Sequence, residues 1–527
     1  MEILTGEQMR RVDRHVIETL GIPSLLLMES AGRAIAGTLI EHYPDAAERG
    51  VVLLCGKGHN GGDGLAAARH LARAGVRPNV VLLARARELH GDVLFQHQAA
   101  IGSGVEVEEV VDAAMWARLA PQLAQHGLVV DALLGTGAHG GARGLLAQVV
   151  EDINACGATI VSVDLPSGVD ADATHVTGPA VQADRTYTLC RPKLPLVTGP
   201  SARLAGTWTV LPIGIPDEAV ASVQPDMEWL DREALRGLFA PRAADSHKGT
   251  YGHLLLVAGS KDKSGAAVLA ARAALRCGVG LVTVATSSSA QSSVAIQQAE
   301  VMTAGLSETP SGNLAKQAAP ALVKMLELRS ALAIGPGLGN EPETFSVVLT
   351  VAVHRSRPTV VDADGLNALA AAGPTALARL REGEVPLVLT PHPGEAARML
   401  GENVSSVQAD RMEAARRIAG QTGAVVVLKG HRTVIAGPDR ALSVNSSGNP
   451  GMATAGTGDA LTGVLGAMLA RGFDARTAAR AAVFVHGDAG DRAAKLRGPE
   501  GMIASDLIEQ LPAALAGLDA PERAASW

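Results

Sequence analysis

Two glycine-rich stretches each carry an aspartate where an anion would be expected to bind. "GKGHNGGDG" spans residues 56–64 and contains Asp63, and "AGTGDALTG" spans residues 455–463 and contains Asp459. A glycine-rich turn before a helix exposes backbone N–H groups and commonly binds phosphate, whereas a carboxylate at contact distance would repel that phosphate. We therefore expect each aspartate either to cap its helix or to do chemistry beside a bound anion.

The first loop matches the G-x-G-x-x-G pattern of dinucleotide-binding turns through Gly56, Gly58 and Gly61. It follows the apolar run 51–55, but the next apolar run, "VVLLARAR", ends without the acidic residue that binds ribose in such proteins. The loop is thus expected to do more than hold a pyrophosphate. Its N–H groups and the Asn60 amide can bind a ligand, while the Asp63 carboxylate can accept ligand hydroxyls or a proton. An alkali cation nearby would reduce the repulsion between this carboxylate and a bound phosphate.

Two further aspartates lie within or at the end of apolar strands. Asp131 precedes "ALLGTGAHGG", and Asp164 follows "TIVSV". In an open parallel sheet the carboxyl ends of the strands form the ligand crevice, so residues 56–64, 131–141 and 164–167 are predicted to share one site. Buried carboxylates are costly without partners, which favours a functional role.

In the second loop, the N–H groups of residues 456–458 are predicted to form an anion site, with Asp459 as a base for a hydroxyl that attacks a phosphoryl group. "VLKGHRT" places Lys429 at a strand end, and "LTPHPGE" places His392 in a proline-containing turn. Alone, such a lysine is usually a solvated side chain, and such a histidine is as often a structural turn residue. Each therefore matters through its placement. The strand-end turns "GPGLG" (335–339) and "DADGLNAL" (362–369) are equally ambiguous, their aspartates being polar partners or caps. H-E-x-x-H and Walker A patterns are absent from the sequence, which excludes the common zinc hydrolases and P-loop ATPases.

Composition limits the class of protein. The 527 residues are 47% apolar and 19% charged, with a formal net charge of −7, which gives no basic footprint for nucleic acid. The four cysteines form no C-x-x-C pair, so a reducing cytoplasm is expected. The N-terminal residues lack the layout of an export signal, and the apolar run 21–40 is interrupted by Glu29 and Arg33, which favours a buried helix over a membrane span.

Short apolar runs alternate with helical patterns in both halves of the chain, as in parallel α/β domains. Between residues 212 and 246 the periodicity is lost and prolines interrupt the chain. We therefore predict two α/β domains, residues 1–220 and 221–527.

"GIPSLLLMESAG", "GKGHNGGDG", "DALLGTGAHG" and "VDLPSGVDAD" together closely resemble the NAD(P)H-hydrate epimerase family, the YjeF N-terminal domains. The resemblance implies a Rossmann-like three-layer domain that interconverts the R and S epimers of hydrated NADH or NADPH, with Asp164 shuttling the proton. One position departs from the pattern, since many members have Asn in place of His59. The implied substrate contacts are His59, Asn60, Gly61, Gly62, Asp63, Gly135, Thr136, Gly137, Ala138, His139, Gly140, Gly141 and Asp164, and the implied K⁺ ligands are Asn60, Asp131 and Ser167.

"GPGLG", "DADGLNAL", "TPHPGE", "VLKGHRT" and "NPGMATAGTGDALTG" resemble the ADP/ATP-dependent NAD(P)H-hydrate dehydratases, the YjeF C-terminal domains, which have a ribokinase-like α/β fold. The resemblance implies that Asp459 activates the ring hydroxyl for phosphorylation, after which phosphate leaves as the double bond re-forms. Mg²⁺ and ADP are expected, with ATP as the alternative donor. The implied contacts are Ala266, Gly337, His392 and Asp459 for the substrate, and Lys429, Gly430, His431, Arg432, Thr433 and Gly458 for the nucleotide.

The sequence thus predicts a bifunctional repair enzyme of hydrated nicotinamide cofactors, forming a homo-oligomer and having neither nucleic-acid nor membrane partners. Two alternatives remain at this stage. One is a ribokinase-type kinase that acts on a small alcohol, and the other is a nucleotide sensor without catalysis.

Overall fold

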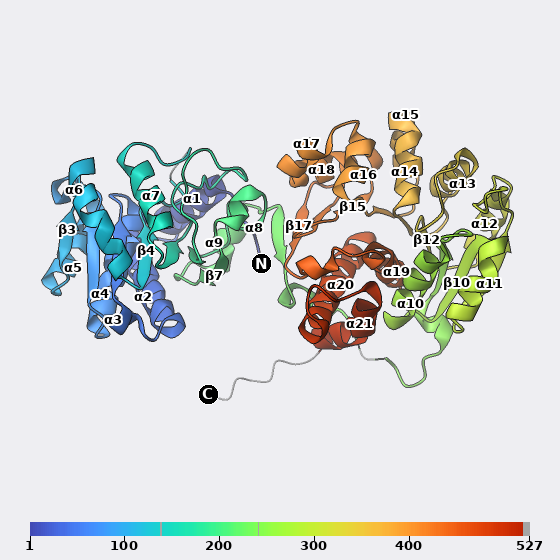
Figure 1. Ribbon diagram of the computed structural model, residues 1–527, viewed down its shortest axis with the longest axis horizontal. Helices are drawn as coiled ribbons and strands as arrows, with labels where there is room; N and C mark the ends of the chain where they lie inside the picture. The colour runs from blue at the N-terminus through green and yellow to red at the C-terminus, as the bar shows by residue number, and fades with distance from the viewer. Residues whose placement is uncertain (138–139, 241, 520–527) are drawn as a thin grey trace. The chain divides into compact units, whose positions relative to one another are not determined.

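The alternating apolar and helical segments form two sheets, each in its own unit (Figure 1). The computed structural model describes residues 1–137, 140–240 and 242–519. One unit contains Glu2–Met227, and the other contains Met1 together with the chain from Glu228 onward. Helix α9 (Asp217–Ala221), through which the predicted boundary at residue 220 passes, belongs wholly to the N-terminal unit.

Within the described residues, the N-terminal sheet has seven strands in the order β3-β2-β1-β4-β5-β6-β7, and every neighbouring pair is parallel. The strands are β1 (Val51–Cys55), β2 (Pro78–Leu82), β3 (Val107–Glu109), β4 (Leu128–Ala132), β5 (Thr159–Val163), β6 (Arg185–Leu189) and β7 (Thr207–Leu211). The longer helices are α1 (Gly6–Arg14), α2 (Ser24–His42), α4 (His59–Arg73), α5 (Gly91–Gly102), α6 (Ala113–Leu119) and α7 (Leu145–Ala155), with short α3 (Ala46–Arg49) and α8 (Leu194–Val197).

Strand β1 shows how this sheet is buried on both faces. Val51, Leu53 and Cys55 pack into the core cluster that includes α2, α4 and α5, whereas Val52 and Leu54 pack into the cluster that includes α6 and α7. Side chains alternate between the two faces of a strand, so a continuous apolar run requires a cover on each face. The predicted three-layer arrangement is therefore confirmed.

The C-terminal sheet has ten strands among the described residues, in the order β11-β10-β9-β12-β13-β14-β15-β16-β17-β8. The strands from β11 to β15 are parallel, and β15–β16 and β16–β17 are antiparallel. The strands are β8 (Met227–Leu230), β9 (His253–Val257), β10 (Leu281–Ser287), β11 (Met302–Leu306), β12 (Ala331–Ile334), β13 (Thr359–Val361), β14 (Leu387–Leu389), β15 (Val425–Leu428), β16 (Val434–Ala436) and β17 (Leu442–Asn445).

Helices cover both faces of this second sheet. Figure 1 shows α19, α20 and α21 along one face and α14, α16 and α18 along the other. The helices are α10 (Ser264–Arg276), α11 (Ser288–Gln297), α12 (Ala318–Glu327), α13 (Pro342–Val353), α14 (Asp364–Ala371), α15 (Gly373–Arg379), α16 (Pro393–Leu400), α17 (Val404–Ala409), α18 (Arg411–Thr422), α19 (Thr457–Ala470), α20 (Ala475–Arg497) and α21 (Ala504–Asp519).

Small residues let α19 lie close to its neighbours. A methyl group added at Gly463 would lie 2.0 Å from the carbonyl oxygen of Ala270 in α10. One added at Gly466 would meet Leu254 and Ala333 of the sheet at 3.0 and 3.2 Å. The backbone of α19 is thereby fixed against the sheet, and with it the position of the glycine turn at its N-terminus.

No described helix is both long and apolar enough to cross a membrane. The run 21–40 forms most of α2, as a buried helix rather than a span. The cysteines Cys55, Cys156, Cys190 and Cys277 all have free thiols.

We predict that Gly463→Ala destabilises the C-terminal unit by about 1–3 kcal/mol, because the new methyl group overlaps backbone that cannot move aside. Gly420→Ala in α18 is the matched control, since nothing lies within 4 Å of the added methyl group. It should instead gain about 0.5–1 kcal/mol through helix propensity. Urea unfolding of both variants measures the difference. Equal stability of the two would show that α19 is not held by this contact.

Candidate active sites

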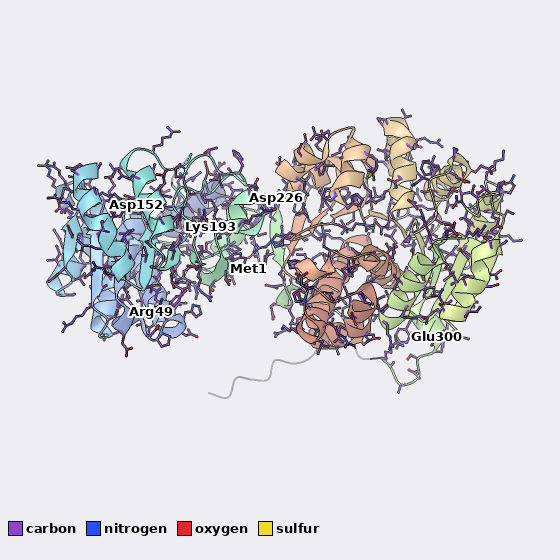
Figure 2. The ribbon with its side chains drawn as sticks, in the orientation of Figure 1. Met1, Arg49, Asp152, Lys193, Asp226 and Glu300 are labelled. Atoms are coloured by element: carbon purple, nitrogen blue, oxygen red, sulfur yellow. The ribbon has the colours of Figure 1, made fainter. Side chains whose placement is uncertain are left out.

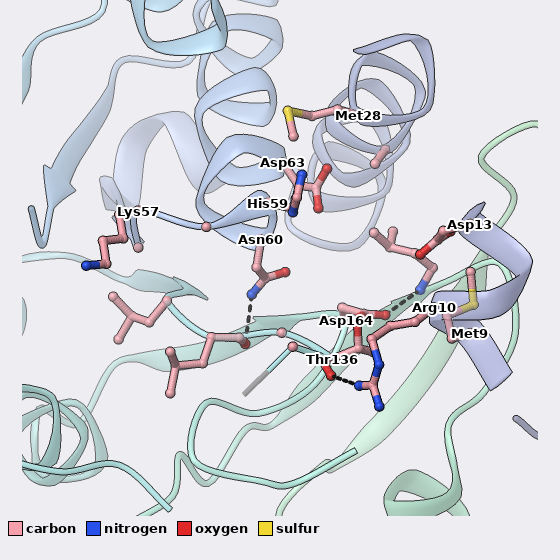
Figure 3. Close-up of a pocket in the computed structure, with 18 of the residues that line it drawn as sticks. Met9, Arg10, Asp13, Met28, Lys57, His59, Asn60, Asp63, Thr136 and Asp164 are labelled. Atoms are coloured by element: carbon pink, nitrogen blue, oxygen red, sulfur yellow. Dashed lines mark hydrogen bonds between the residues drawn. The ribbon is translucent and has the colours of Figure 1, made fainter. Parts of the chain in front are cut away.

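The carboxyl ends of β1, β4 and β5 meet at a cavity of about 940 Å³ in the N-terminal unit (Figure 3). Its lining includes residues 56–60 with Asp63, residues 133–137, and Asp164. The three strand ends predicted to share a site therefore do so. The helix α1 and the segment after β6 add Asp13 and Lys193, two residues that the sequence reasoning missed.

Asp63 is not a helix cap. Helix α4 begins after Gly58, without a side-chain cap, and Asp63 lies a turn further along with 8% of its surface exposed. It has no hydrogen-bond or ion-pair partner within the described part of the chain, and the capping alternative is wrong. Burial, together with the nearby Asp164 and Asp13 carboxylates, raises the pKa of Asp63 well above its ordinary value. The group therefore holds a proton more tightly than an ordinary aspartate does and can donate it to a ligand.

Asp164, unlike Asp63, has several hydrogen-bond partners. Its backbone is left-handed, with φ 67°, at the end of β5, a conformation that costs a non-glycine residue about 1–3 kcal/mol and clusters at functional sites. Its Oδ1 accepts bonds from the Leu189 N–H at 3.1 Å, the Thr188 hydroxyl and the Lys193 ammonium. These donors all reach Oδ1, so Oδ2 is available to a ligand.

Lys193 lies inside the N-terminal unit, only 1% exposed (Figure 2). Besides Asp164, its Nζ donates to Thr188 Oγ1 at 3.1 Å and to the Leu189 carbonyl at 2.6 Å. The buried ammonium of Lys193 thus has three hydrogen-bond acceptors, one of which is the Asp164 carboxyl group. The signal in the sequence was a lone lysine in the apolar stretch "KLPLV", which shows burial but not its partner.

The three residues expected to hold K⁺ lie together. Asp131 is fully buried and accepts bonds from the Ser167 N–H at 2.8 Å, the Ser167 hydroxyl at 2.5 Å and the Ser162 hydroxyl at 2.8 Å. Asn60 donates from Nδ2 to the Leu134 carbonyl, and the Leu134 N–H donates to Ser167 Oγ. The buried Asn60 Oδ1 has no hydrogen-bond partner among the described residues.

Several predicted contacts shape the loops rather than line the cavity. A methyl group at Gly61 would lie 1.7 Å from the Gly56 carbonyl, and one at Gly141 would lie 1.8 Å from the Thr177 carbonyl. Gly62 packs against Met28, and the Gly140 N–H donates to Asp170. His59, Gly135, Thr136 and Gly137 do line the cavity, whereas Ala138 and His139 lie outside the described residues.

In the C-terminal unit, Asp459 lies in the first turn of α19, whose N-cap is Gly456 with φ 88°. The carboxylate makes no hydrogen bond or ion pair with any described residue, so here too the capping alternative is wrong. Burial and the neighbouring Asp362 raise the pKa of Asp459 to about 6. Above that pH it is an ionised acceptor beside the helix N-terminus, and so a base for a bound hydroxyl.

Lys429 follows β15 and contacts a group of acids. Its Nζ donates to Asp362 Oδ1 at 2.7 Å and lies 3.9 Å from Glu395 Oε2. Although burial alone would raise it, Lys429 and the Thr462 hydroxyl lower the pKa of Asp362. Burial and Asp362 raise the pKa of Glu395 to about 7. Of the two aspartates left ambiguous by the sequence, Asp362 is thus a polar partner of Lys429.

Gly458 adjoins this lysine. A methyl group at Gly458 would meet only Lys429 Nζ, at 3.7 Å, so the turn is open where a phosphate would bind. Asp364 accepts the Gly339 N–H at 2.8 Å and so fixes the "GPGLG" turn. That turn brings Gly337 against Ala266, the two residues assigned to the substrate.

His392 caps helix α16. Its Nδ1 accepts the Gly394 and Glu395 N–H groups, and Glu395 Oε2 accepts the His392 N–H in return. Burial and Lys429 lower the pKa of His392, so the ring is neutral. Half of this side chain is exposed, which leaves the ring free to contact a ligand.

Two further residues that sequence reasoning missed hold the nucleotide loop and the helix start. Arg411 of α18 donates to the His431 carbonyl at 2.5 Å and to the Leu428 carbonyl at 3.0 Å, which fixes the loop 429–433. The Thr433 hydroxyl closes that loop on the Gly430 carbonyl, and Arg432 lies over the Trp229 ring. His486 of α20 hydrogen-bonds through Nε2 to the Thr457 carbonyl at 2.8 Å. Neither residue lies in a motif, and no sequence signal indicates its partner.

We predict that Asp63→Asn stabilises the N-terminal unit above neutral pH. A raised carboxyl pKa means that the folded state binds the proton more tightly, so stability falls as pH rises from about 4 upward, and an amide escapes this loss. Thermal melts of variant and wild type should diverge with rising pH and coincide at acid pH. Glu18→Gln, an exposed site on the same unit, is the control. A lower melting temperature for Asp63→Asn at high pH would contradict the account.

Comparisons with known proteins find relatives of both units. A family model described as YjeF-related protein N-terminus matches residues 24–194, and one described as NAD(P)H-hydrate dehydratase matches residues 254–513. A solved structure of the ADP/ATP-dependent NAD(P)H-hydrate dehydratase from Bacillus subtilis, co-crystallised with ATP and Mg²⁺, is 33% identical, with a TM-score of 0.49. It covers 55% of this chain and 99% of that one.

Full-length relatives share both halves. The bifunctional NAD(P)H-hydrate repair enzyme Nnr of Moorella thermoacetica is 42% identical over 520 residues, covering 98% of this chain and 97% of the relative. The protein of the same name from Escherichia coli K12 is 34% identical over 506 residues, covering 96% and 92%. With both family models matched and the likeness extending over nearly the whole chain, this protein belongs to the family of bifunctional NAD(P)H-hydrate repair enzymes.

Proposed function

We propose that the N-terminal unit interconverts the R and S epimers of hydrated NADH or NADPH, and that the C-terminal unit dehydrates the S epimer at the expense of an adenine nucleotide. The observation that carries the proposal is Asp459. It is a partly buried carboxylate without a partner among the described residues, placed beside an open glycine turn and Lys429. A structural role does not account for such a group, whereas phosphoryl transfer from a nucleotide to a hydroxyl requires it.

At the C-terminal site, Asp459 accepts the proton of the ring hydroxyl as that oxygen attacks the terminal phosphoryl group. The N–H groups at the start of α19 and Lys429 stabilise charge on the transferred group. Phosphate is a better leaving group than hydroxide, so the double bond re-forms as it departs. Ala266, Gly337 and His392 hold the substrate, and Gly458 with the loop 429–433 holds the nucleotide.

We favour ADP as the phosphoryl donor, with ATP as the alternative. Mg²⁺ would accompany the nucleotide, because it binds substrate phosphates with few protein ligands. We also propose that the protein acts in the cytoplasm and forms a homo-oligomer.

At the N-terminal site, the basic side chains that line the cavity suit a dinucleotide pyrophosphate. They include Arg10, Arg14, Lys57 and Arg143, in addition to Lys193 beside Asp164. The nicotinamide end would then reach Asp63 and Asp164, deeper at the strand ends, where Asp164 shuttles the proton.

K⁺ is proposed at Asn60, Asp131 and Ser167. These residues fit a cation because Asn60 Oδ1 is a buried oxygen without a partner, beside the Asp131 carboxylate network. A cation there would offset the charge of the neighbouring carboxylates.

We expect Asp459→Asn to lower kcat for dehydration of the S epimer by about 10²–10⁴-fold, the usual contribution of a general base, while nucleotide binding stays within about threefold, because the amide keeps the shape of the site. The rate of the wild type should fall as pH drops below about 6, where Asp459 becomes protonated. The assay follows the near-ultraviolet absorbance of NAD(P)H, with binding by calorimetry.

Glu509→Gln, on the exposed face of α21, is the control for this charge change. An unaltered rate in Asp459→Asn would exclude the proposed base. A stable phosphorylated product would support a small-molecule kinase instead, and binding without turnover in the wild type would support a sensor.

Replacing K⁺ by tetramethylammonium should lower both the epimerisation rate and the melting temperature of the N-terminal unit, because the buried oxygens lose their counter-charge. Asn60→Ala should abolish the difference between the two salts. Differential scanning fluorimetry and a rate assay in each salt measure this. A melting temperature and rate that do not depend on K⁺ would contradict the ion site.

A further inference from the structure

Helix α1 brings a third carboxyl group, that of Asp13, to the cavity of the N-terminal unit. The helix is fixed at the cavity by contacts that do not involve Asp13. Arg10 donates to the Thr136 carbonyl at 2.9 Å and to Asp172, and the Glu7 N–H also donates to Asp172 (Figure 3). The Thr5 capping box holds its N-terminus.

Asp13 has no structural task that the described residues reveal. It caps no helix, and its carboxyl group forms no hydrogen bond or ion pair with another described residue. Met9, Val12 and Val16 on the same helical arm are buried in the core, whereas Asp13 faces the cavity beside them. Asp13 is only partly exposed, and a carboxyl group shielded from water without a partner is expensive to retain and so indicates a use.

Among Asp13 and the carboxyl groups around it, at least one must hold a proton. Asp63 of α4 and Asp164 at the end of β5 face the same hollow (Figure 3), with the Lys193 ammonium from the segment after β6. His59 lies on the α4 side, and α1 itself adds Arg10 and Arg14. Three carboxyl groups around one buried ammonium cannot all ionise without a large electrostatic cost. Burial in particular raises the pKa of Asp13 to about 6, while the Lys193 ammonium contacts Asp164 Oδ1.

Inverting a carbon that bears a hydroxyl group needs one acid and one base, in alternation. The hydroxyl of a hydrated nicotinamide is on the carbon next to the ring nitrogen. A proton given to that oxygen lets the C–O bond break, with its electron pair leaving on water while the nitrogen lone pair forms a C=N bond. Water then adds to the opposite face, the C=N electrons return to nitrogen, and the added water gives up a proton. Atoms and charge balance, and no other reactant is consumed.

We propose that Asp13 is a catalytic residue of the epimerase site and that it exchanges this proton in partnership with Asp164. The carboxyl of Asp13 protonates the departing hydroxyl for one epimer, and the Asp164 carboxylate accepts the proton from the adding water. For the opposite epimer the roles reverse. Lys193 contacts Asp164 Oδ1 and so fixes the position of this carboxyl group. The inference rests on the proposed epimerase function and extends it to a residue outside the sequence motifs quoted above.

The test compares Asp13→Asn, Asp13→Glu and the control Glu18→Gln in the full-length protein. Glu18 is exposed on the same N-terminal arm and does not line the cavity. Starting from the pure R epimer with nucleotide, Asp13→Asn should lower the kcat for epimerisation about 100-fold or more, with little change in KM. Glu18→Gln should match the wild type, and Asp13→Glu should recover part of the rate. The wild-type rate should change as the pH passes through about 6, where Asp13 titrates. This change should be absent from Asp13→Asn.

Other outcomes have distinct meanings. An Asp13→Asn rate within threefold of the wild type would overturn the proposal, and so would a changed KM with unchanged kcat, which would make Asp13 a binding residue. If Asp13→Asn fails to melt cooperatively, Asp13→Glu decides, since a catalytic role requires its pH dependence to shift. A wild type that dehydrates the S epimer but does not speed epimerisation would instead refute the epimerase function itself.

Discussion

Each unit keeps a carboxylate in the first two turns of a helix that, at one of its glycines, packs too closely on neighbouring backbone for any side chain. The constraint is backbone packed directly on backbone. Gly61 of α4 lies against the Gly56 carbonyl, and Gly463 of α19 lies against the Ala270 carbonyl, at distances that no Cβ allows. The helix start is thereby fixed at the carboxyl edge of the sheet. Asp63 and Asp459 are carried into a ligand crevice where the protein offers them no partner.

The buried acids of this protein fall into two kinds. Asp131 and Asp362 are surrounded by donors, the serines in one case and Lys429 with Thr462 in the other, and they hold loops together. Asp63, Asp13 and Asp459 lack partners, and burial raises the pKa of each. Acids of this second kind lower the stability of the folded state at neutral pH. A protein retains them where its chemistry depends on them. Except at Asp164, where the donors hold Oδ1 and leave Oδ2 available to a ligand, the same distinction separates positioning residues from reacting ones in both sites.

The sequence allowed much of this to be predicted, because the signals were local. Apolar runs that end in glycine and aspartate indicated parallel strands, and the rule for strand ends placed residues 56–64, 131–141 and 164–167 at one cavity. Asp13, Lys193, Arg411 and His486 could not be found in this way. Lys193 meets Asp164 only through the pairing of β5 with β6, and His486 reaches Thr457 only through the packing of α20 on α19. Such contacts depend on tertiary packing, which neither spacing nor motif records. The ambiguity between cap and catalyst at Asp63 was also beyond the sequence, because it depends on where α4 begins.

The central claim is that two independent sites act on one damaged cofactor, and a single time course tests it most directly. The full-length protein is incubated with an equal mixture of the R and S epimers and an adenine nucleotide, and the return of near-ultraviolet absorbance is followed to completion. The account predicts recovery of both epimers, faster than spontaneous epimerisation, and no recovery without nucleotide. Recovery that stops near half of the mixture, or that proceeds equally without nucleotide, would contradict it.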